Sequence, residues 1–311
     1  MLTIFSTGKP FRGHCGMIQR NALKSWTSLH PDVEVILFGD DEGAAEVASE
    51  LGILHVPQVD RHESGMKYLR SIFDPAQELA RHSILCYVNC DIVLTSDFRV
   101  AIERLQTLHP KFVMIGRRWD IDVQGSVSFD APDWEGNLRR LALSEGNQRS
   151  ANWIDYFVFP RGLYSGQLPD FVIGRVEWDN WLVWRARKSG WPVVDASEAV
   201  VAIHQNHDYG YHPSGAAGVW GDELAQRNRI LAGGKFHICT IDDATHSLGP
   251  EGERRTARHI FRPAYRLQRT AREVAWLALL DWTRPVRKVL GLRQKTLRAV
   301  AARWREKVPK S

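Results

Sequence analysis

Short apolar runs of strand-forming residues alternate with segments of helical spacing along most of the chain, and this alternation constrains the fold most strongly. Strands are predicted at 2–7, 34–41, 53–59, 84–94, 112–115, 156–160, 193–195, 200–203 and 236–240. Helical spacing is found at 18–29, 42–51, 134–143, 176–188 and 221–231, and also in the segment that follows the polar loop 60–67 and ends at about 81. Such an alternation favours a mostly parallel, doubly wound α/β sheet flanked by helices.

Composition sets the limits within which this fold must be built. The 311 residues are 44% hydrophobic, enough to bury the core of one large or two smaller domains. The four cysteines show neither a C-x-x-C pair nor zinc spacing, and Cys86 and Cys90 are expected to be buried thiols in a reducing compartment. We see no signal-peptide pattern, and the apolar runs are far shorter than the roughly 20 residues of a membrane span. These features predict a cytoplasmic protein.

Charge is distributed unevenly and divides the chain into two predicted parts. Residues 251–311 carry 17 Lys and Arg against 5 Asp and Glu, whereas the rest carries 24 bases against 31 acids. The tail also places Val286, Val289, Leu297 and Trp304 near one line of a helix, with Arg and Lys over most of the remainder. We therefore predict a catalytic domain over 1–250 and a basic amphipathic helical tail over 251–311. The tail suits an anionic membrane surface, and the alternative is packing on its own domain or on a partner subunit.

Nucleic acid is a poor fit as a partner of the predicted catalytic part. That part is mildly acidic and shows no helix-turn-helix, zinc-finger or RNA-binding signature. The Walker loop, the G-x-G-x-x-G fingerprint and the G-x-S-x-G elbow are absent as well.

The predicted strand at 84–94 carries a polar pair, Asn89 and Asp91, between apolar residues. A buried carboxylate is costly without a cation or hydrogen-bond donors. Ligands of open α/β sheets sit at the carboxyl ends of the strands, where a carboxylate can hold a divalent metal and, through it, a phosphate. The alternative is that Asp91 caps a turn and Asn89 bonds to the backbone.

Three further clusters follow predicted strands or begin a predicted helix. Asp179 lies near a helix start between Trp178 and Trp181, where a carboxylate beside an indole could bind sugar hydroxyls or accept a proton. His204 begins a polar run that continues to His207 and follows an apolar strand, and neutral imidazole is a common metal ligand. The third cluster comprises Lys9, Asp40 and Asp41, which also occur in ordinary α/β loops.

These residues resemble the GT-A glycosyltransferases, in which a D-x-D motif after a strand binds metal and diphosphate. The equivalent here is Asn89-Cys90-Asp91 within YVNCDIVL, the acceptor-side acid is Asp179 within VEWDNWL, and the late histidine is His204 within AIHQNHDY. The resemblance covers residues 1–245, and STGKPF, VILFGDDEG, GRRWD and DYFVFPRG look like a bacterial branch of that class. It implies a GT-A fold that binds a nucleotide-sugar donor.

The resemblance also implies roles for single residues. Asp179 would be catalytic, and Asp91 and His204 would hold Mn²⁺ or Mg²⁺. Asn89 replaces the first acid of D-x-D and brings no charge, so the metal is expected to bind less tightly. Donor contacts would come from Thr7, Lys9, Asp40, Asp41, Asn89 and Asp91. The acceptor and sugar pocket would be formed by Asp155, Trp178, Asn180 and His207.

The resemblance leads us to expect transfer of a sugar from a UDP- or GDP-sugar to a hydroxyl of a glycan or lipid-linked glycan. The setting would be bacterial cell-surface polysaccharide synthesis, with the enzyme peripheral on the cytoplasmic face of the inner membrane. Two alternatives remain. One is a non-catalytic sugar- or lipid-binding module. The other is a sugar-phosphate nucleotidyltransferase, which would need a glycine-rich loop that STGKPFRG does not supply.

Overall fold

A computed structural model describes residues 1–208, 215–234 and 237–256. These residues fall within one compact unit, Met1–His259. The predicted basic tail lies outside the described residues from position 257 onward.

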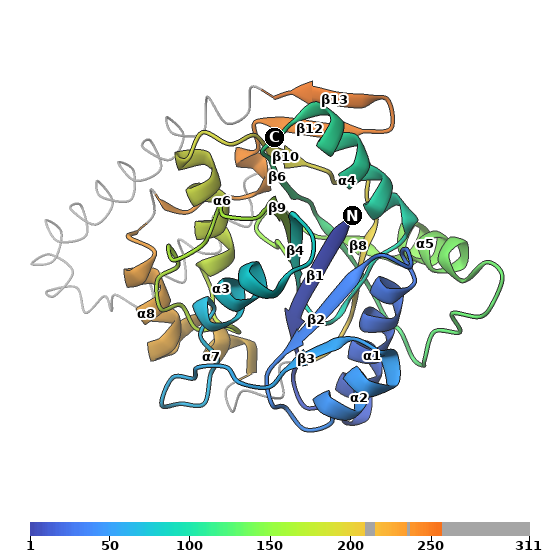
Figure 1. The fold of residues 1–311 in the computed structure, drawn as a ribbon, viewed down its shortest axis with the longest axis horizontal. Coiled ribbons are helices and arrows are strands. Elements are labelled where there is room, and N and C mark those ends of the chain that lie inside the picture. Colours follow the sequence, from blue (N-terminus) through green and yellow to red (C-terminus); the bar gives the residue numbers. More distant parts are fainter. Residues whose placement is uncertain (209–214, 235–236, 257–311) are drawn as a thin grey trace, which may run out of the picture. The chain divides into compact units, whose positions relative to one another are not determined.

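The centre of the fold is a nine-stranded sheet in the order β13-β12-β10-β6-β9-β4-β1-β2-β3 (Figure 1). β9 and β13 run antiparallel to their neighbours, and the other pairings are parallel. The strands are β1 Leu2–Thr7, β2 Glu34–Phe38, β3 Leu54–Val56, β4 Ile84–Val88, β6 Val113–Ile115, β9 Tyr156–Pro160, β10 Val193–Asp195, β12 His246–Gly249 and β13 Gly252–Arg255.

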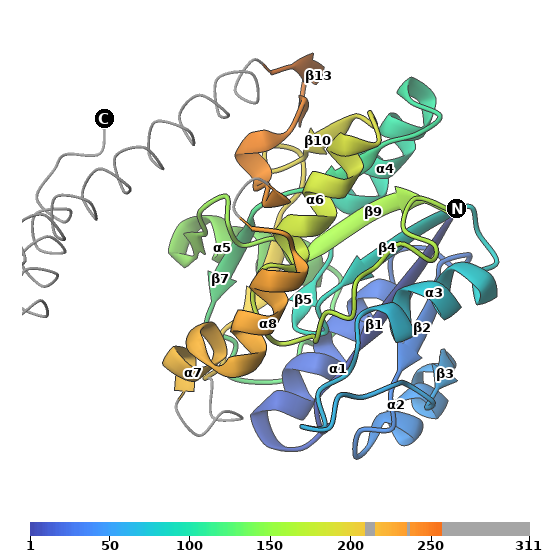
Figure 2. The ribbon, with the colours of Figure 1, turned by 90° about the vertical axis from the view of Figure 1, so that its left-hand side faces the viewer.

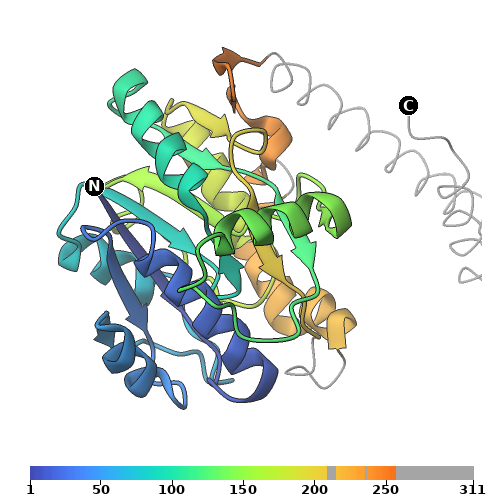
Figure 3. The same cartoon turned by 90° about the vertical axis from the view of Figure 1, so that its right-hand side faces the viewer.

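Helices cover both faces of this sheet, which explains why its inner strands are predominantly apolar and largely buried. Ile4 of β1 belongs to the core under α1 (Gly13–Thr27), α2 (Ala44–Leu51) and α4 (Ser96–Leu108). Phe5, its neighbour, belongs to the core under α3 (Arg70–Leu79) and α6 (Trp178–Lys188). Figure 2 shows the face with α3 and α6, and Figure 3 shows the opposite face with α1 and α4.

A second, four-stranded sheet runs in the order β5-β11-β7-β8. It consists of β5 Ile92–Val93, β11 Ala202–Gln205, β7 Arg118–Ile121 and β8 Asn147–Gln148. Its apolar face packs on α5 (Trp134–Glu145) through Ile121, Ile203 and Leu138. The remaining described elements are α7 Gly215–Gly221, α8 Glu223–Leu231 and the 3₁₀ turn η2 Ile241–Asp243.

The predicted α/β class and mostly parallel sheet are confirmed, and the strands predicted at 2–7, 156–160 and 193–195 have the expected bounds. Three predictions were wrong. Residues 84–94 form two strands separated by a turn at Asn89–Asp91, and His204, predicted to follow a strand that ends at 203, lies inside β11. The strand predicted at 236–240 is not formed over its described part, 237–240, and the hairpin β12–β13 supplies the edge instead.

Among the described residues, no helix has both the length and the apolar character needed to cross a bilayer.

Candidate active site

Asn89 and Asp91 lie at the carboxyl end of β4, in the turn that leads from the large sheet into the small one. The amide of Ile92 donates to the carbonyl of Asn89, which closes the turn. Ile92 of β5 pairs in register with His204 of β11. Strand pairing therefore brings His204 beside Asp91 although the two residues are far apart in the sequence.

Asp91, His204 and His207 form a compact group of potential metal ligands. Nε2 of His207 is 3.0 Å from Oδ2 of Asp91, and Nε2 of His204 is 3.9 Å from the same oxygen. One ligand atom from each residue lies within 4.8 Å of the other two. A carboxylate with two imidazoles is a donor set that suits divalent transition metals.

The state of Asp91 supports this interpretation. Burial opposes ionisation, but the hydrogen bond with His207 and the charges of His204 and Lys9 hold the pKa of Asp91 well below its usual range. Its Oδ1 is buried and has no hydrogen-bond partner among the described residues. An ionised, buried carboxylate with an unsatisfied oxygen is costly unless a cation compensates it. The residues present therefore fit a divalent cation.

Asp120 lies against the imidazole nitrogen of His204 that faces away from Asp91. The parallel pairing of β11 with β7 places His204 opposite Asp120, and Nδ1 of His204 lies 3.2 Å from Oδ1 of Asp120. Asp120 is held in turn by Nε of Arg118 at 2.8 Å and Nε of Arg149 at 2.5 Å. A carboxylate on one imidazole nitrogen orients the ring and raises the basicity of the other nitrogen.

Asn89 contacts Asp155 rather than the metal-ligating group. Its amide nitrogen donates to Oδ1 of Asp155 at 2.7 Å, and Nη1 of Arg118 donates to the same oxygen at 2.9 Å. β9 runs antiparallel to β4, so Asp155, just before β9, lies at the carboxyl end of β4. Oδ2 of Asp155 is buried and unpartnered among the described residues. The pair thus leaves one carboxylate oxygen for a ligand.

Asp179 lies in the first turn of α6, and burial raises its pKa to about 7, with the charges of Asp155 and Glu177 acting in the same direction. Asp91, Asp155 and Asp179 each act electrostatically on the buried hydroxyl of Tyr87. The charges of all three carboxylates therefore act on the same part of the sheet. The turn before α6 is strained, because Glu177 has a φ of 82°, a conformation rare for residues other than glycine.

The two neighbours of Asp179 are tied into the protein interior. Trp178 is 6% exposed, and its ring lies 5.5 Å from the ring of Tyr87 in an edge-to-face contact. The side chain of Asn180 donates to the carbonyl of Cys239 at 2.9 Å. Trp178 thus offers no open face for stacking, and both residues help to fix the start of α6.

Thr7 and Asp41 meet at the carboxyl ends of β1 and β2, joined by the buried Lys67. Nζ of Lys67 donates to Oγ1 of Thr7 at 2.7 Å and also to Asp41. Burial lowers the pKa of Lys67, while the charge of Asp41 opposes this effect. Gly39, with a φ of 104°, borders the group, and a Cβ there would lie 3.0 Å from Nζ of Lys67. Lys9 is near enough for its charge to act on Asp91.

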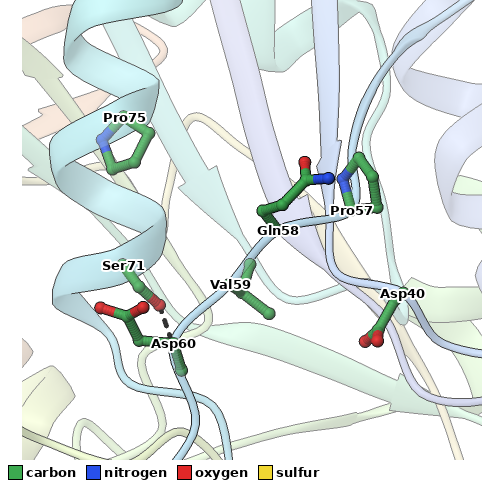
Figure 4. Close-up of a pocket in the computed structure, with 7 residues that line it drawn as sticks. All are labelled: Asp40, Pro57, Gln58, Val59, Asp60, Ser71 and Pro75. Carbon is green, nitrogen blue, oxygen red and sulfur yellow. Dashed lines mark hydrogen bonds between the residues drawn. The ribbon is translucent and has the colours of Figure 1, made fainter.

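Asp40 lies apart from these groups. Its exposed carboxylate accepts a hydrogen bond from Arg61, which lowers the pKa of Asp40. It borders an open hollow of about 460 Å³ between β3 and α3, whose lining is drawn in Figure 4. Of the predicted site residues, the hollow contains Asp40 alone. The ligand group around Asp91 lies elsewhere.

An aromatic pair adjoins the ion-pair network. The rings of Trp153 and Trp220 lie 5.4 Å apart, and Trp220 is 46% exposed. The guanidinium groups of Arg118 and Arg149 lie over the Trp153 ring, 4.8 Å and 5.1 Å from its centre. This arrangement joins a partly exposed indole surface to the residues that hold Asp120 and Asp155.

The structure thus brings the predicted residues Asp91 and His204 together and adds His207, which had been predicted in the acceptor pocket. Asn89 pairs with Asp155, and Asp40 is remote. Sequence reasoning missed Lys67, Arg118 and Asp120. Arg118 and Asp120 stand in the motif GRRWD after the strand at 113–115, which was a usable signal. Lys67 belongs to a polar loop, and no sequence signal marked it as a site residue.

Comparison of the fold with solved structures finds glycosyltransferases. The first is a fragment of TarS from S. aureus with UDP-GlcNAc (10% identity, 66% of this chain and 58% of that one, TM-score 0.45). A mannosyltransferase from Pyrobaculum calidifontis with GDP-Man and Mn²⁺ is also similar (14% identity, 68% of this chain and 58% of that one, TM-score 0.42). So is glucosyl-3-phosphoglycerate synthase from Mycobacterium tuberculosis with Mg²⁺ and UDP (11% identity, 67% of this chain and 72% of that one, TM-score 0.39).

The chain spans 58% of the TarS fragment. No protein-family model and no curated protein sequence matches it.

Proposed function

We propose that the protein is a divalent-metal-dependent glycosyltransferase. It moves a sugar from a UDP- or GDP-sugar to a hydroxyl of a glycan or glycolipid. The observation that carries this proposal is the convergence of Asp91, His204 and His207 on one point at the carboxyl end of the sheet. The low pKa of Asp91 and its unsatisfied oxygen call for a cation there.

Asp91, His204 and His207 would hold Mn²⁺ or Mg²⁺, with Mn²⁺ favoured because Mg²⁺ is bound mainly through oxygen ligands. When bound, the cation would neutralise the charge that develops on a leaving diphosphate. Asp120, whose Oδ1 lies 3.2 Å from Nδ1 of His204, would help to orient that imidazole toward Asp91. Asn89, in place of an acid, instead positions Asp155. The two imidazoles therefore replace the donor that a first acid would supply.

Asp179 is the proposed catalytic carboxylate. A group with a pKa of about 7 is well matched to accepting a proton from a sugar hydroxyl near neutral pH. If configuration at the anomeric carbon inverts, Asp179 acts as the general base. If configuration is retained, it orients or stabilises the oxocarbenium-like sugar instead.

The two ends of the site would bind different parts of the substrates. Thr7 and Asp41, fixed by Lys67, lie at the ends of β1 and β2 and suit the nucleoside. Lys9, whose charge acts on Asp91, suits the phosphates. Asp155 and the exposed indole of Trp220 suit a sugar acceptor, since indole rings bury the apolar faces of sugars. If the basic tail holds the enzyme at the cytoplasmic face of a membrane, a lipid-linked glycan is a suitable acceptor.

The test is turnover of UDP- and GDP-sugars, measured as nucleotide release with and without Mn²⁺. Release should require Mn²⁺ and fall by at least about 100-fold in Asp91→Asn, equivalent to about 2.7 kcal/mol of transition-state stabilisation. Asp32→Asn, an exposed acid before β2, is the matched control and should keep wild-type rates.

Three outcomes would contradict the proposal. A wild-type turnover rate in Asp91→Asn would show that the proposed metal site has no role in the reaction. Donor binding without release of nucleotide for any sugar would identify a sugar-binding module instead. Formation of a nucleotide sugar from a nucleoside triphosphate and a sugar phosphate would identify a nucleotidyltransferase.

A further inference from the structure

A second group of metal-ligating side chains lies outside the proposed active site, where the hairpin β12–β13 meets the end of α4. His109 follows α4 directly, His246 opens β12 and Glu253 belongs to β13. One ligand atom from each lies within 4.8 Å of the other two. None of the three has a role in the proposed transfer reaction.

The strand register explains why these residues meet. Leu248 pairs with Glu253 across the hairpin, and His246 pairs with Arg255. Side chains alternate along a strand, so His246, Leu248 and Glu253 share one face. Leu248 is fully buried in the core cluster that includes residues of α4. His246 and Glu253 therefore lie on the face that packs toward α4, at whose end His109 stands.

Hydrogen bonds hold the three side chains in place. Nε2 of His109 is 2.7 Å from Oε1 of Glu253, and the two side chains are 18% and 14% exposed. The ring of His246 lies 5.4 Å from that of His109. The hydroxyl of Thr245 donates to the carbonyl of Val193, so Nδ1 of His246, 2.9 Å away, donates to Oγ1 of Thr245. Such support fixes the orientation and tautomer of a ligating imidazole.

We propose that His109, His246 and Glu253 form a structural site for a divalent transition metal, with Zn²⁺ preferred, that fastens the β12–β13 hairpin to α4. Two imidazoles and one carboxylate are a common protein ligand set for Zn²⁺, whereas Mg²⁺ prefers oxygen donors. Zinc ligands lie about 2.0–2.2 Å from the metal, so closure needs side-chain shifts on the order of 1 Å. With three protein ligands, a water molecule would take the fourth coordination position.

The direct test is the number of Zn²⁺ ions bound by the full chain, measured by competition with a chromophoric chelator. The double variant His109→Gln, His246→Gln should bind one equivalent fewer than the wild type. The matched control, His30→Gln with His82→Gln, changes two histidines outside the group and should keep the wild-type number. Equal numbers in the first variant and the wild type would overturn the proposal.

Hydrogen exchange separates this site from the group around Asp91. Zn²⁺ should slow exchange of the β13 amides at least tenfold in the wild type and in Asp91→Asn with His207→Gln. It should have no effect in His109→Gln with His246→Gln. Protection that follows the Asp91 substitutions instead would overturn the proposal. If the double variant unfolds in chelator, Glu253→Gln, which retains an oxygen toward His109, takes its place with the same expected loss.

Discussion

At the scale of single residues, Asp179 is a carboxylate whose surroundings in the folded protein disfavour its ionised form. Its pKa is about 7 in the folded protein and near 3.8 in the unfolded chain, so the folded state binds more protons between these values. Stability then falls as pH rises from about 4 to 7 and levels off above 7. Because a carboxylate at position 179 lowers the stability of the fold near neutral pH, a catalytic role explains its presence better than a structural role does.

Asp179→Asn should therefore be more stable than the wild type above pH 7, by roughly 2–4 kcal/mol, and lose this advantage near pH 4. The same variant should lose activity. Urea unfolding at pH 4 and pH 8, with chelator present, measures the difference. In the wild type, kcat/KM should rise with pH through an apparent pKa near 7. A pH-independent stability difference would contradict the assignment.

Glu177 offers a second prediction at this scale, because its φ of 82° is rare for residues with a Cβ. Its contact with Arg229, 3.5 Å between Oε1 and Nε, is partly exposed and worth little. Glu177→Gly should be more stable than Glu177→Ala by about 1 kcal/mol, since both lose the contact but only glycine relieves the strain. Thermal unfolding of the two variants provides the comparison, and an equally stable alanine variant would exclude strain at this turn.

At the scale of elements, the register between β7 and β11 decides the geometry of the proposed metal site. Asp120 is buried opposite His204 and is held by two arginines. Asp120→Asn should weaken Mn²⁺ binding by about 10–100-fold while leaving the fold intact. Electron paramagnetic resonance titration of free Mn²⁺ measures this affinity. Asp122→Asn, an exposed acid just after β7, is the control, and equal affinities in both variants would exclude a supporting role for Asp120.

The elements that the sequence predicts well are those whose residues are apolar on both faces. The apolar side chains of β1 and of residues 156–159 in β9 pack against one helical layer or the other, so apolar runs mark where both strands lie. The strands of the small sheet cannot be predicted from apolar runs. β5 has two residues and β11 has four, of which His204 and Gln205 are polar but buried. Burial of these side chains depends on partners from distant segments, which no local pattern contains.

The site follows the same division. Asp91 and Asp179 could be predicted because an acid beside a buried strand or at a helix start needs a reason. Lys67 could not, since only the folded structure places its amine between Thr7 and Asp41. The pairing of Asn89 with Asp155 likewise depends on β9 running antiparallel beside β4. The direction of β9 is set by the topology of the whole sheet and cannot be predicted from the local sequence.

At the scale of the whole molecule, the unequal distribution of charge is the feature that the proposed reaction leaves unused. Residues 257–311 carry 15 Lys and Arg against 3 Asp and Glu. Each basic side chain near an anionic bilayer contributes about 1 kcal/mol, and the attraction weakens with salt. The cut for a truncation must follow β13, because Thr256 still donates its hydroxyl to the carbonyl of Ala244 at 2.7 Å.

Deletion of 257–311 should abolish sedimentation with vesicles rich in phosphatidylglycerol and leave turnover on a soluble acceptor within about twofold. The full chain should sediment with these vesicles at low salt, less at 0.5 M salt, and not with neutral phosphatidylcholine, because the attraction is electrostatic. A truncated protein that still sediments would place the contact in the catalytic part. Sedimentation of the full chain that is unchanged by salt and lipid charge would instead indicate apolar insertion, and the basic residues would then have another role.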